Sequence, residues 1–84
     1  MTKEELEEWI VQRVARELSV PPDHIDVSIP LAGLGLDSAQ AVALTGELED
    51  LLKRRISPTV VYEHPTISRL AAHLAAVEEP EPGR

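Results

Sequence analysis

Residues 35–54, GLDSAQAVALTGELEDLLKR, form a helix pattern that opens with glycine, leucine, aspartate and serine and is the strongest structural signal in the chain. Turning this helix at about 100° per residue gathers its large apolar residues on one side, which must face a core. These are Leu44, Leu48, Leu51 and Leu52, with Ala41 nearby. Asp37 and Gln40 have the spacing of a capping box. We therefore predict a helix from Asp37 or Ser38 to about Arg54.

The opposite side of this helix carries small apolar residues with an acidic rim. On it lie Ala39, Val42 and Gly46, flanked by Ala43, Glu49 and Asp50. A solvated face would favour long polar side chains, and a glycine inside a helix costs about 1 kcal/mol relative to alanine. The pattern indicates a surface that another protein approaches closely. The alternative is an unimportant face that tolerates small residues.

Ser38 stands where a helix N-terminus can hold a phosphate. A serine at such a position is ordinarily only a helix cap, but Asp37 already suits that role. Gly33 and Gly35 let the backbone turn sharply just upstream and keep bulk away from the hydroxyl. A phosphate on Ser38 would meet free backbone amides and the positive end of the helix dipole. Ser38 is therefore a candidate site for a phosphate-linked group.

Three further helices are predicted around this one. The first spans Lys3–Leu18, where Thr2 opens a capping box and apolar residues recur every four positions. A short helix over residues 59–63 follows Ser57-Pro58, which read as the N-cap and the first helical position. The last helix begins after Thr66 as its cap. The chain is therefore predicted to be all-α, a small four-helix bundle with a long first loop and a short third helix.

A long connector over residues 20–36 joins the first two long helices. Its apolar residues are too many for a free linker, and we expect them to pin it across the bundle: Ile25, Val27, Ile29, Leu31, Leu34 and Leu36. A loop this long in a small domain is more often functional than idle. We expect residues 1–77 to form one domain and residues 78–84, acidic and rich in proline, to form a flexible tail.

Charge and composition exclude several classes of protein. The net charge of −7 over 84 residues argues against binding nucleic acid or an anionic membrane surface, and favours partners with basic patches. The absence of cysteine excludes disulfides and thiolate metal sites. No apolar run approaches membrane-spanning length and the N-terminal residues do not read as a signal peptide, so we expect a cytoplasmic protein.

Catalysis and metal binding are disfavoured. Ser38 with its neighbouring aspartate and a histidine (His24, His64 or His73) could be imagined as a hydrolase triad, but Gln40 stands where a nucleophile elbow has glycine. A core this small leaves no room for a substrate pocket. The histidines lack the helical spacing of metal ligands, so we predict no metal site. We expect His64 and His73 to be solvated or capping residues.

Two motifs resemble those of a known family. Gly35-Leu36-Asp37-Ser38 resembles the phosphopantetheine attachment motif of acyl carrier proteins. The run from Ile56 to Leu74 is similar to the end of carrier domains in modular polyketide synthases. The match extends over nearly the whole chain, from the first helix to the last. Two motifs at this separation, in a chain of this length, make the resemblance specific.

The resemblance implies a four-helix bundle of acyl-carrier type that is not an enzyme. A phosphopantetheinyl transferase would attach 4′-phosphopantetheine from coenzyme A to Ser38, and the thiol of this arm would hold an acyl group as a thioester during polyketide or related fatty acyl biosynthesis. The other implied partners of this monomer are an acyltransferase or acyl-adenylating ligase and a ketosynthase or other polyketide synthase enzymes. Partner contacts carried over by position are Leu36, Asp37, Ala39, Gln40, Val42, Ala43, Gly46, Glu47, Glu49 and Asp50.

The chain departs from the family pattern at two positions on this face. Ala39 stands where the family commonly has a larger aliphatic residue, and Ala43 where it often has glutamate, which indicates a dedicated set of partners. Leu36-Asp37 before the serine, rather than Gly-Asp, favours an acyl over a peptidyl carrier. The alternatives are a peptidyl or aryl carrier of nonribosomal peptide-type assembly and a helical adaptor whose Ser38 is never modified.

Overall fold

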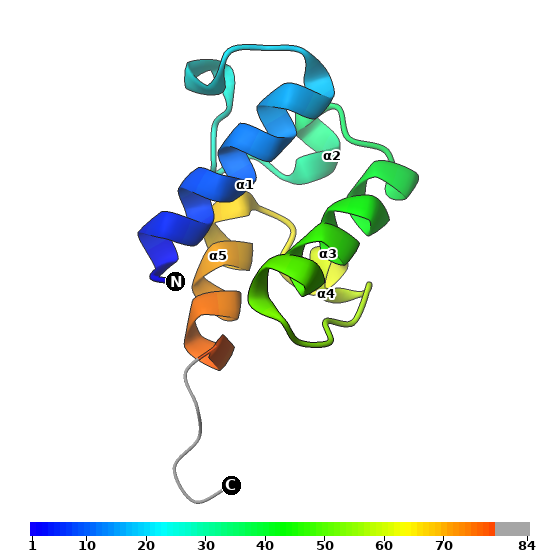
Figure 1. The fold of residues 1–84 in the computed structure, drawn as a ribbon. Helices are drawn as coiled ribbons and strands as arrows, with labels where there is room; N and C mark the ends of the chain where they lie inside the picture. The colour runs from blue at the N-terminus through cyan, green and yellow to red at the C-terminus, as the bar shows by residue number, and fades with distance from the viewer. Residues whose placement is uncertain (79–84) are drawn as a thin grey trace, which may run out of the picture.

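The computed structural model describes residues 1–78 and shows a helical bundle with no strand in that range (Figure 1). Its elements are α1 (Lys3–Leu18), the 3-10 turn η1 (Pro22–His24), α2 (Leu31–Leu34), α3 (Ser38–Leu52), α4 (Val60–Glu63) and α5 (Ile67–Glu78). The predicted fold class is confirmed, and the four predicted helices correspond to α1, α3, α4 and α5. Two elements, η1 and α2, were not predicted.

The first helix has the bounds that the sequence predicts. The Thr2 hydroxyl accepts from the Glu5 amide at 3.1 Å, and the Glu5 carboxylate accepts from the Thr2 amide at 2.8 Å, which completes the capping box. The helix ends at Ser19, whose left-handed backbone has φ of 59°. Its buried face consists of Leu6, Ile10, Val11, Val14 and Ala15.

The long connector contains a single turn of helix, α2, which ends at a glycine. Gly35 has φ of 113°, and the amides of Gly35 and Leu36 each donate to an α2 carbonyl at 3.2 Å. Such an ending requires a left-handed residue, which explains the glycine. The prediction that the connector is pinned holds for Ile25, Leu31 and Leu36, which are buried. It is wrong for Ile29, which is 37% exposed.

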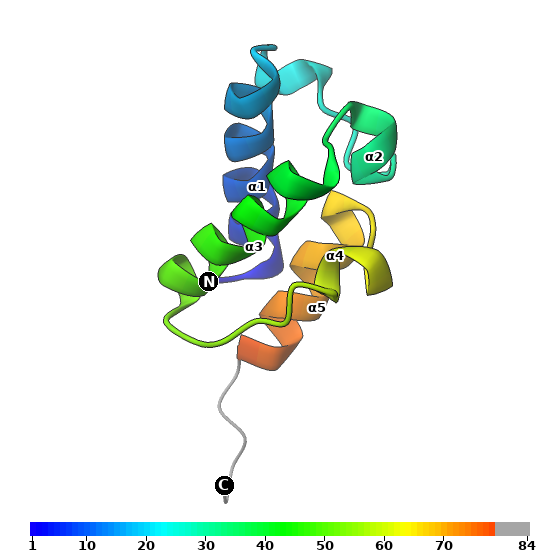
Figure 2. The ribbon, with the colours of Figure 1, turned by 90° about the vertical axis from the view of Figure 1, so that its right-hand side faces the viewer.

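Backbone hydrogen bonds join the connector to the start of α5. The Leu31 amide donates to the Pro65 carbonyl at 2.8 Å, and the Ser68 amide donates to the Val27 carbonyl at 3.0 Å. Pro30 and Thr66 form an isolated antiparallel bridge between these two bonds. These bonds hold α2 beside the segment that links α4 to α5. In Figure 2, α2 and α4 lie together on the side of the bundle away from α1.

The short helix begins later than predicted. Thr59, and not Ser57, stands directly before it, but the Ser57 hydroxyl accepts from the Thr59 amide at 3.3 Å and its carbonyl from the Val60 amide at 3.0 Å, so Ser57 caps the turn that leads into the helix. This local turn uses the serine oxygens before the helix starts. Thr59 stands at the N-cap position and makes no capping bond with its side chain. Thr66 does cap α5 as predicted, by accepting from the Arg69 amide at 3.1 Å.

Helix α5 extends one residue into the segment that we predicted as a tail. Glu78, which we expected to open the tail, is the last residue of α5. The rest of the predicted tail, residues 79–84, lies outside the described residues.

Aliphatic side chains from α1, α3 and α5 build the core. The largest fully buried ones are Leu6, Ile10, Val14, Leu48, Ile67, Leu70 and Leu74. Helix α1 packs chiefly against α5. Thr45 is a buried polar residue that the apolar pattern of α3 did not identify, and its hydroxyl donates to the Ala41 carbonyl at 3.1 Å.

Within residues 1–78, none of the helices combines the length and the apolar character needed to cross a bilayer.

Candidate functional site

The start of α3 is held by a reciprocal pair of hydrogen bonds. The Asp37 carboxylate accepts from the Gln40 amide at 2.8 Å, and the Gln40 side-chain oxygen accepts from the Asp37 amide at 2.9 Å. The predicted capping box is therefore present, with Asp37 as the N-cap. Ser38 is the first helical residue, is exposed, and is not the capping side chain.

Two backbone amides at this helix end remain available. The first amides of any helix lack a partner inside it. Here the Gln40 amide donates to the Asp37 side chain, and the Ala41 amide donates to the Asp37 carbonyl at 3.0 Å. Within residues 1–78 the structure shows no hydrogen bond from the amides of Ser38 or Ala39. A phosphate on the Ser38 hydroxyl would therefore find two amide donors and the positive end of the α3 dipole.

The two upstream glycines have different roles. Gly35 makes the sharp turn into α3, as predicted, because its positive φ is unfavourable for other residues. Gly33 does not make room for the Ser38 hydroxyl. A Cβ atom at Gly33 would lie 3.0 Å from the Ile29 Cγ2 atom, so this glycine lets the Ile29 side chain lie against the backbone of α2.

A hollow of about 270 Å³ opens beside Ser38, between α2, α3 and α4. Asp37 and Ser38 are part of its wall, and apolar side chains form most of the rest: Ala32, Leu36, Ala41, Val61, Tyr62 and Pro65. The expectation that the chain leaves no room for a pocket was wrong, because this space lies at the surface between short elements and not inside the core. Tyr62, which is 65% exposed, is a site residue that the sequence reasoning missed.

The outward side of α3 carries a small-residue strip, which we define as Ala39, Val42, Ala43 and Gly46. All four are exposed, as predicted from the helical periodicity, and Val42 is 47% exposed. A Cβ atom at Gly46 would meet nothing within 4 Å, so no neighbour within the chain explains the glycine. A partner could therefore approach close to the α3 backbone here.

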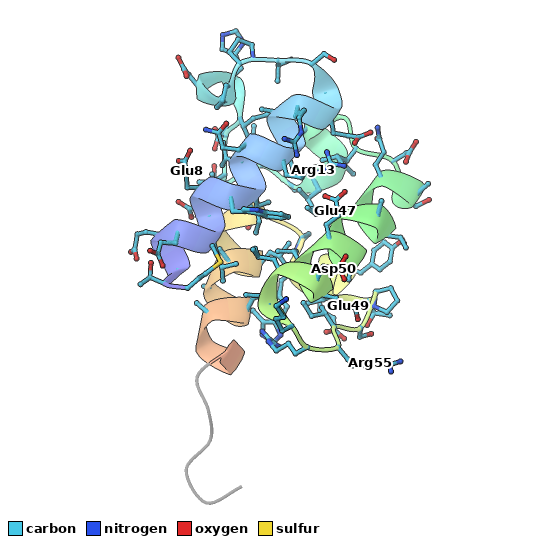
Figure 3. All side chains as sticks on the ribbon, in the orientation of Figure 1. Glu8, Arg13, Glu47, Glu49, Asp50 and Arg55 are labelled. Atoms are coloured by element: carbon cyan, nitrogen blue, oxygen red, sulfur yellow. The ribbon has the colours of Figure 1, made fainter. Side chains whose placement is uncertain are left out.

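Two acidic residues beside the strip are engaged within the fold. The Glu47 carboxylate accepts hydrogen bonds from the Arg13 guanidinium of α1, with Nη2 and Oε2 3.0 Å apart (Figure 3). These hydrogen bonds lower the pKa of Glu47 and raise the pKa of Arg13. The Glu49 carboxylate accepts from the Ile56 amide at 2.7 Å, which fastens the segment after α3. Asp50 is exposed at the same end of α3.

The predicted partner contacts therefore fall into two groups. Exposed to a partner are Asp37, whose carboxylate also accepts from the Gln40 amide, and Ala39, Val42, Ala43, Gly46 and Asp50. Leu36 is 7% exposed and belongs to the core, and Gln40, Glu47 and Glu49 are half-buried and hydrogen-bonded inside the chain. In this second group, burial or bonding within the chain leaves less of each side chain for a partner, and the contacts stay a prediction.

The histidines do not form a triad with Ser38, since none of them lines the hollow beside it. His64 and His73 are half-buried, and His64 stands at the C-cap position of α4; their rings stack with centroids 4.0 Å apart, a contact that the sequence reasoning missed. Across residues 1–78, no three side chains of histidine, aspartate or glutamate gather as metal ligands would.

Comparison with known proteins connects this geometry to a family. The family model described as "Phosphopantetheine attachment site" matches residues 8–74. A phenolphthiocerol/phthiocerol polyketide synthase of Mycobacterium tuberculosis is 45% identical over 78 residues. That alignment covers 93% of this chain and 4% of the relative, so the chain spans a small fraction of the relative's length.

Two solved structures have the same fold. A free-standing peptidyl carrier protein from Acinetobacter baumannii aligns with a TM-score of 0.87 and 36% identity, covering 93% of this chain and 98% of that one. Asl1650, an acyl carrier protein from Anabaena with a variant phosphopantetheinylation-site sequence, aligns with a TM-score of 0.87 and 31% identity, covering 93% of this chain and 89% of that one. Acyl and peptidyl carriers alike share this arrangement of helices.

Proposed function

The chain belongs to the phosphopantetheine attachment family, whose members are non-catalytic carriers of a 4′-phosphopantetheine group, and from this premise we propose that Ser38 bears that group. The observation that carries the proposal is the exposed Ser38 hydroxyl at the first position of α3, which is free for modification because Asp37 caps the helix. When bound, the group supplies a terminal thiol that can hold an acyl chain as a thioester.

The residues around Ser38 suit this role. The amides of Ser38 and Ala39 point out of the helix end and can donate to the phosphate, while the capping box keeps the end of α3 in place. Ser38 stands at the wall of the apolar hollow, so an arm attached there starts beside a surface that can shield part of the tethered group. The chain itself contributes no nucleophile to the thioester chemistry.

We infer a role as an acyl carrier in polyketide assembly, supported by the identity to a polyketide synthase. Tethering would raise the effective concentration of the acyl group at each partner enzyme. The proposed partners are a phosphopantetheinyl transferase, an acyltransferase or acyl-adenylating ligase, and a ketosynthase. A cytoplasmic location and a monomeric state belong to the same proposal.

The small-residue strip is the surface that we propose partners contact, together with Asp37 and Asp50. Glu47 and Glu49 are occupied by Arg13 and by the Ile56 amide, so few carboxylates on α3 remain for a basic partner. A partner that fits this face therefore makes mainly apolar, close contacts with α3. This apolar docking differs from the expectation, drawn from the net charge, that basic patches on a partner recognise the chain.

A peptidyl carrier is the second candidate, supported by the likeness to the solved peptidyl carrier protein. It would bear the same arm at Ser38 and differ only in carrying an aminoacyl group. Loading of the modified protein with acyl and with aminoacyl groups, each by a matching adenylating ligase, separates the two candidates.

Localisation of the modification tests the attachment site. The folded protein is incubated with a phosphopantetheinyl transferase and coenzyme A, digested, and sequenced by tandem mass spectrometry. We expect the added group on the peptide that contains Ser38, with Ser28 and Ser57, which are also exposed, left unmodified. A group found on either of those serines would overturn the assignment.

A further inference from the structure

A pair of stacked histidines joins α4 to α5. His64 is the C-cap residue of α4, and its amide donates to the Val60 carbonyl at 2.9 Å. His73 lies in α5, and the two rings stack with centroids 4.0 Å apart and planes inclined by 17°. Both residues are half-buried. The ring of His64 is therefore fixed to the end of one helix and packed on the side of another.

Helix α4 depends on contacts of this kind. It has four residues and no side-chain cap at its start, and a helix this short is not stable by itself in water. Val60 and Val61 bury their side chains in the core on one side. The histidine stack holds the end of the helix, directly before Pro65.

The same short segment forms one wall of the hollow beside Ser38. Val61 and Tyr62 of α4 line that hollow, as does Pro65. Any change in how α4 lies against α5 must therefore change the hollow. His64 stands between Tyr62 and Pro65 in the chain, so the stack lies directly beside this wall in the sequence.

The surroundings of the stack favour a neutral His73 ring. Burial lowers the pKa of His73 from its ordinary value of 6.5, and His64 and Arg54 lower it further, while Glu63 of α4 acts in the opposite direction. Arg69 of α5 borders the same side-chain cluster and adds another positive charge. The pair therefore has two positive neighbours, Arg69 of α5 and Arg54 from the segment after α3. The Glu63 carboxylate of α4 acts in the opposite direction.

We propose that the His64–His73 stack is a pH-sensitive contact, which holds α4 against α5 while both rings are neutral and releases it when they are protonated. Two protonated imidazoles in a stacked arrangement repel each other, and burial disfavours the charged form of His73. Release of α4 would move Val61 and Tyr62 and so reshape the hollow beside Ser38. The proposal requires only the fold and does not depend on modification of Ser38.

The direction of the pH effect follows from the lowered pKa of His73. The unfolded chain binds a proton at His73 more readily than the folded chain does, so the contact loses stability as the pH falls below about 6.5. The loss is complete once the pH lies below the pKa of His73 in the folded state. Above 6.5 the contact is at full strength.

NMR titration of the unmodified protein between about pH 7.5 and pH 5 tests the proposal. We expect the His73 ring to titrate with a midpoint below its ordinary value and the Tyr62 amide shift to follow with the same midpoint. In His64→Gln the midpoint of His73 should rise, and the pH response of the Tyr62 amide should fall to less than half. His24→Gln, which changes an exposed histidine, serves as the matched control and should leave both unchanged.

A Tyr62 amide that ignores pH while His73 titrates would overturn the proposal, as would an undiminished response in His64→Gln. Hydrogen exchange of the α4 amides in the wild-type protein gives a second readout that needs no variant. After correction for the intrinsic effect of pH, we expect opening of α4 to be about tenfold more frequent at the low end of the range. An unchanged opening frequency would also overturn the proposal.

Discussion

At the start of α3, Asp37 and Ser38 divide two roles between them. Asp37 fills the N-cap, and Ser38 leaves its hydroxyl exposed. We expect Asp37→Ala to lower the free energy of unfolding by about 1 kcal/mol, because it removes the cap. Asp37→Asn should cost much less, since asparagine caps as well as aspartate does. Urea unfolding measures both, and equal stabilities of the alanine and asparagine variants would contradict this account of the cap.

Two glycines respond in opposite ways to alanine. Gly46 lies exposed in the middle of α3 with open space around it, so Gly46→Ala should raise the free energy of unfolding by about 0.5–1 kcal/mol. Gly35 has φ of 113°, so Gly35→Ala should lower it by about 1–2 kcal/mol. Thermal unfolding of the two variants under the same conditions checks both changes in stability. If both variants gained or both lost stability, these different roles of Gly46 and Gly35 would be refuted.

Single residues were predictable where their partners are close in sequence. Thr2 and Asp37 were identified as caps because their partners lie three residues away. Glu47 and Glu49 were assigned to a docking rim, because nothing local shows that Arg13 and the Ile56 amide occupy them. The attachment at Ser38 stays a prediction, supported by the exposed hydroxyl and the capping aspartate.

Between elements, the Arg13–Glu47 ion pair makes the contact of α1 with α3 sensitive to acid. Arg13 lowers the pKa of Glu47 below its ordinary value of 4.5, so the stability it adds is present above that value and is lost as the pH falls through the folded-state pKa. The Glu47 side chain is 40% exposed, which limits the contribution of the pair to about 0.5–1 kcal/mol.

We therefore expect Glu47→Gln to be less stable than the wild type near neutral pH, with the deficit shrinking at an acidic pH below 4.5, as the glutamate takes up its proton. Urea unfolding at both pH values measures the difference. A deficit that persists unchanged at the acidic pH would show that the ion pair is not its cause.

The small-residue strip of α3 gives a prediction for partner transfer. Val42→Asp and Gly46→Arg place charge or bulk on exposed positions, so the fold should survive. We expect each to slow acyl transfer with a partner enzyme about tenfold, which corresponds to about 1.4 kcal/mol. The wild-type rate should change little with salt, because the contact is mainly apolar. Glu4→Arg, which changes an exposed residue of α1, is the matched control.

If Val42→Asp, Gly46→Arg and Glu4→Arg all transferred at the same rate, partners would not dock on the small-residue strip. A rate that falls steeply with salt in the wild type would instead assign recognition to charged groups such as Asp37 and Asp50.

Among the elements, long helices were predictable and short ones were not. Helices α1 and α3 each combine a capping box with a repeated apolar stripe, and α1 has the bounds that this pattern predicts. Helix α2 has four residues, too few for any periodicity, and depends on Gly35 and on bonds to Pro65 far along the chain. Helix α4 begins later than predicted because Ser57 closes a turn before it.

For the whole molecule, the aliphatic core followed from composition, but the hollow beside Ser38 did not. Its wall joins residues from α2, α3, α4 and the segment just before α5, which come together only through tertiary packing. The stack of His64 on His73 arises in the same way, from helices whose relative placement no local pattern specifies. The arrangement brings the exposed serine, the hollow and the short helix α4 to one side of the bundle.

Attachment at Ser38 is tested by the intact mass of the folded protein after incubation with coenzyme A, Mg²⁺ and a promiscuous phosphopantetheinyl transferase, beside Ser38→Ala treated in the same way. Circular dichroism confirms that both proteins are folded, which we expect because Asp37 still caps α3 in the variant. We expect a gain of one phosphopantetheine in the wild type and none in Ser38→Ala. No gain in the wild type, or an equal gain in the variant, would contradict attachment at Ser38.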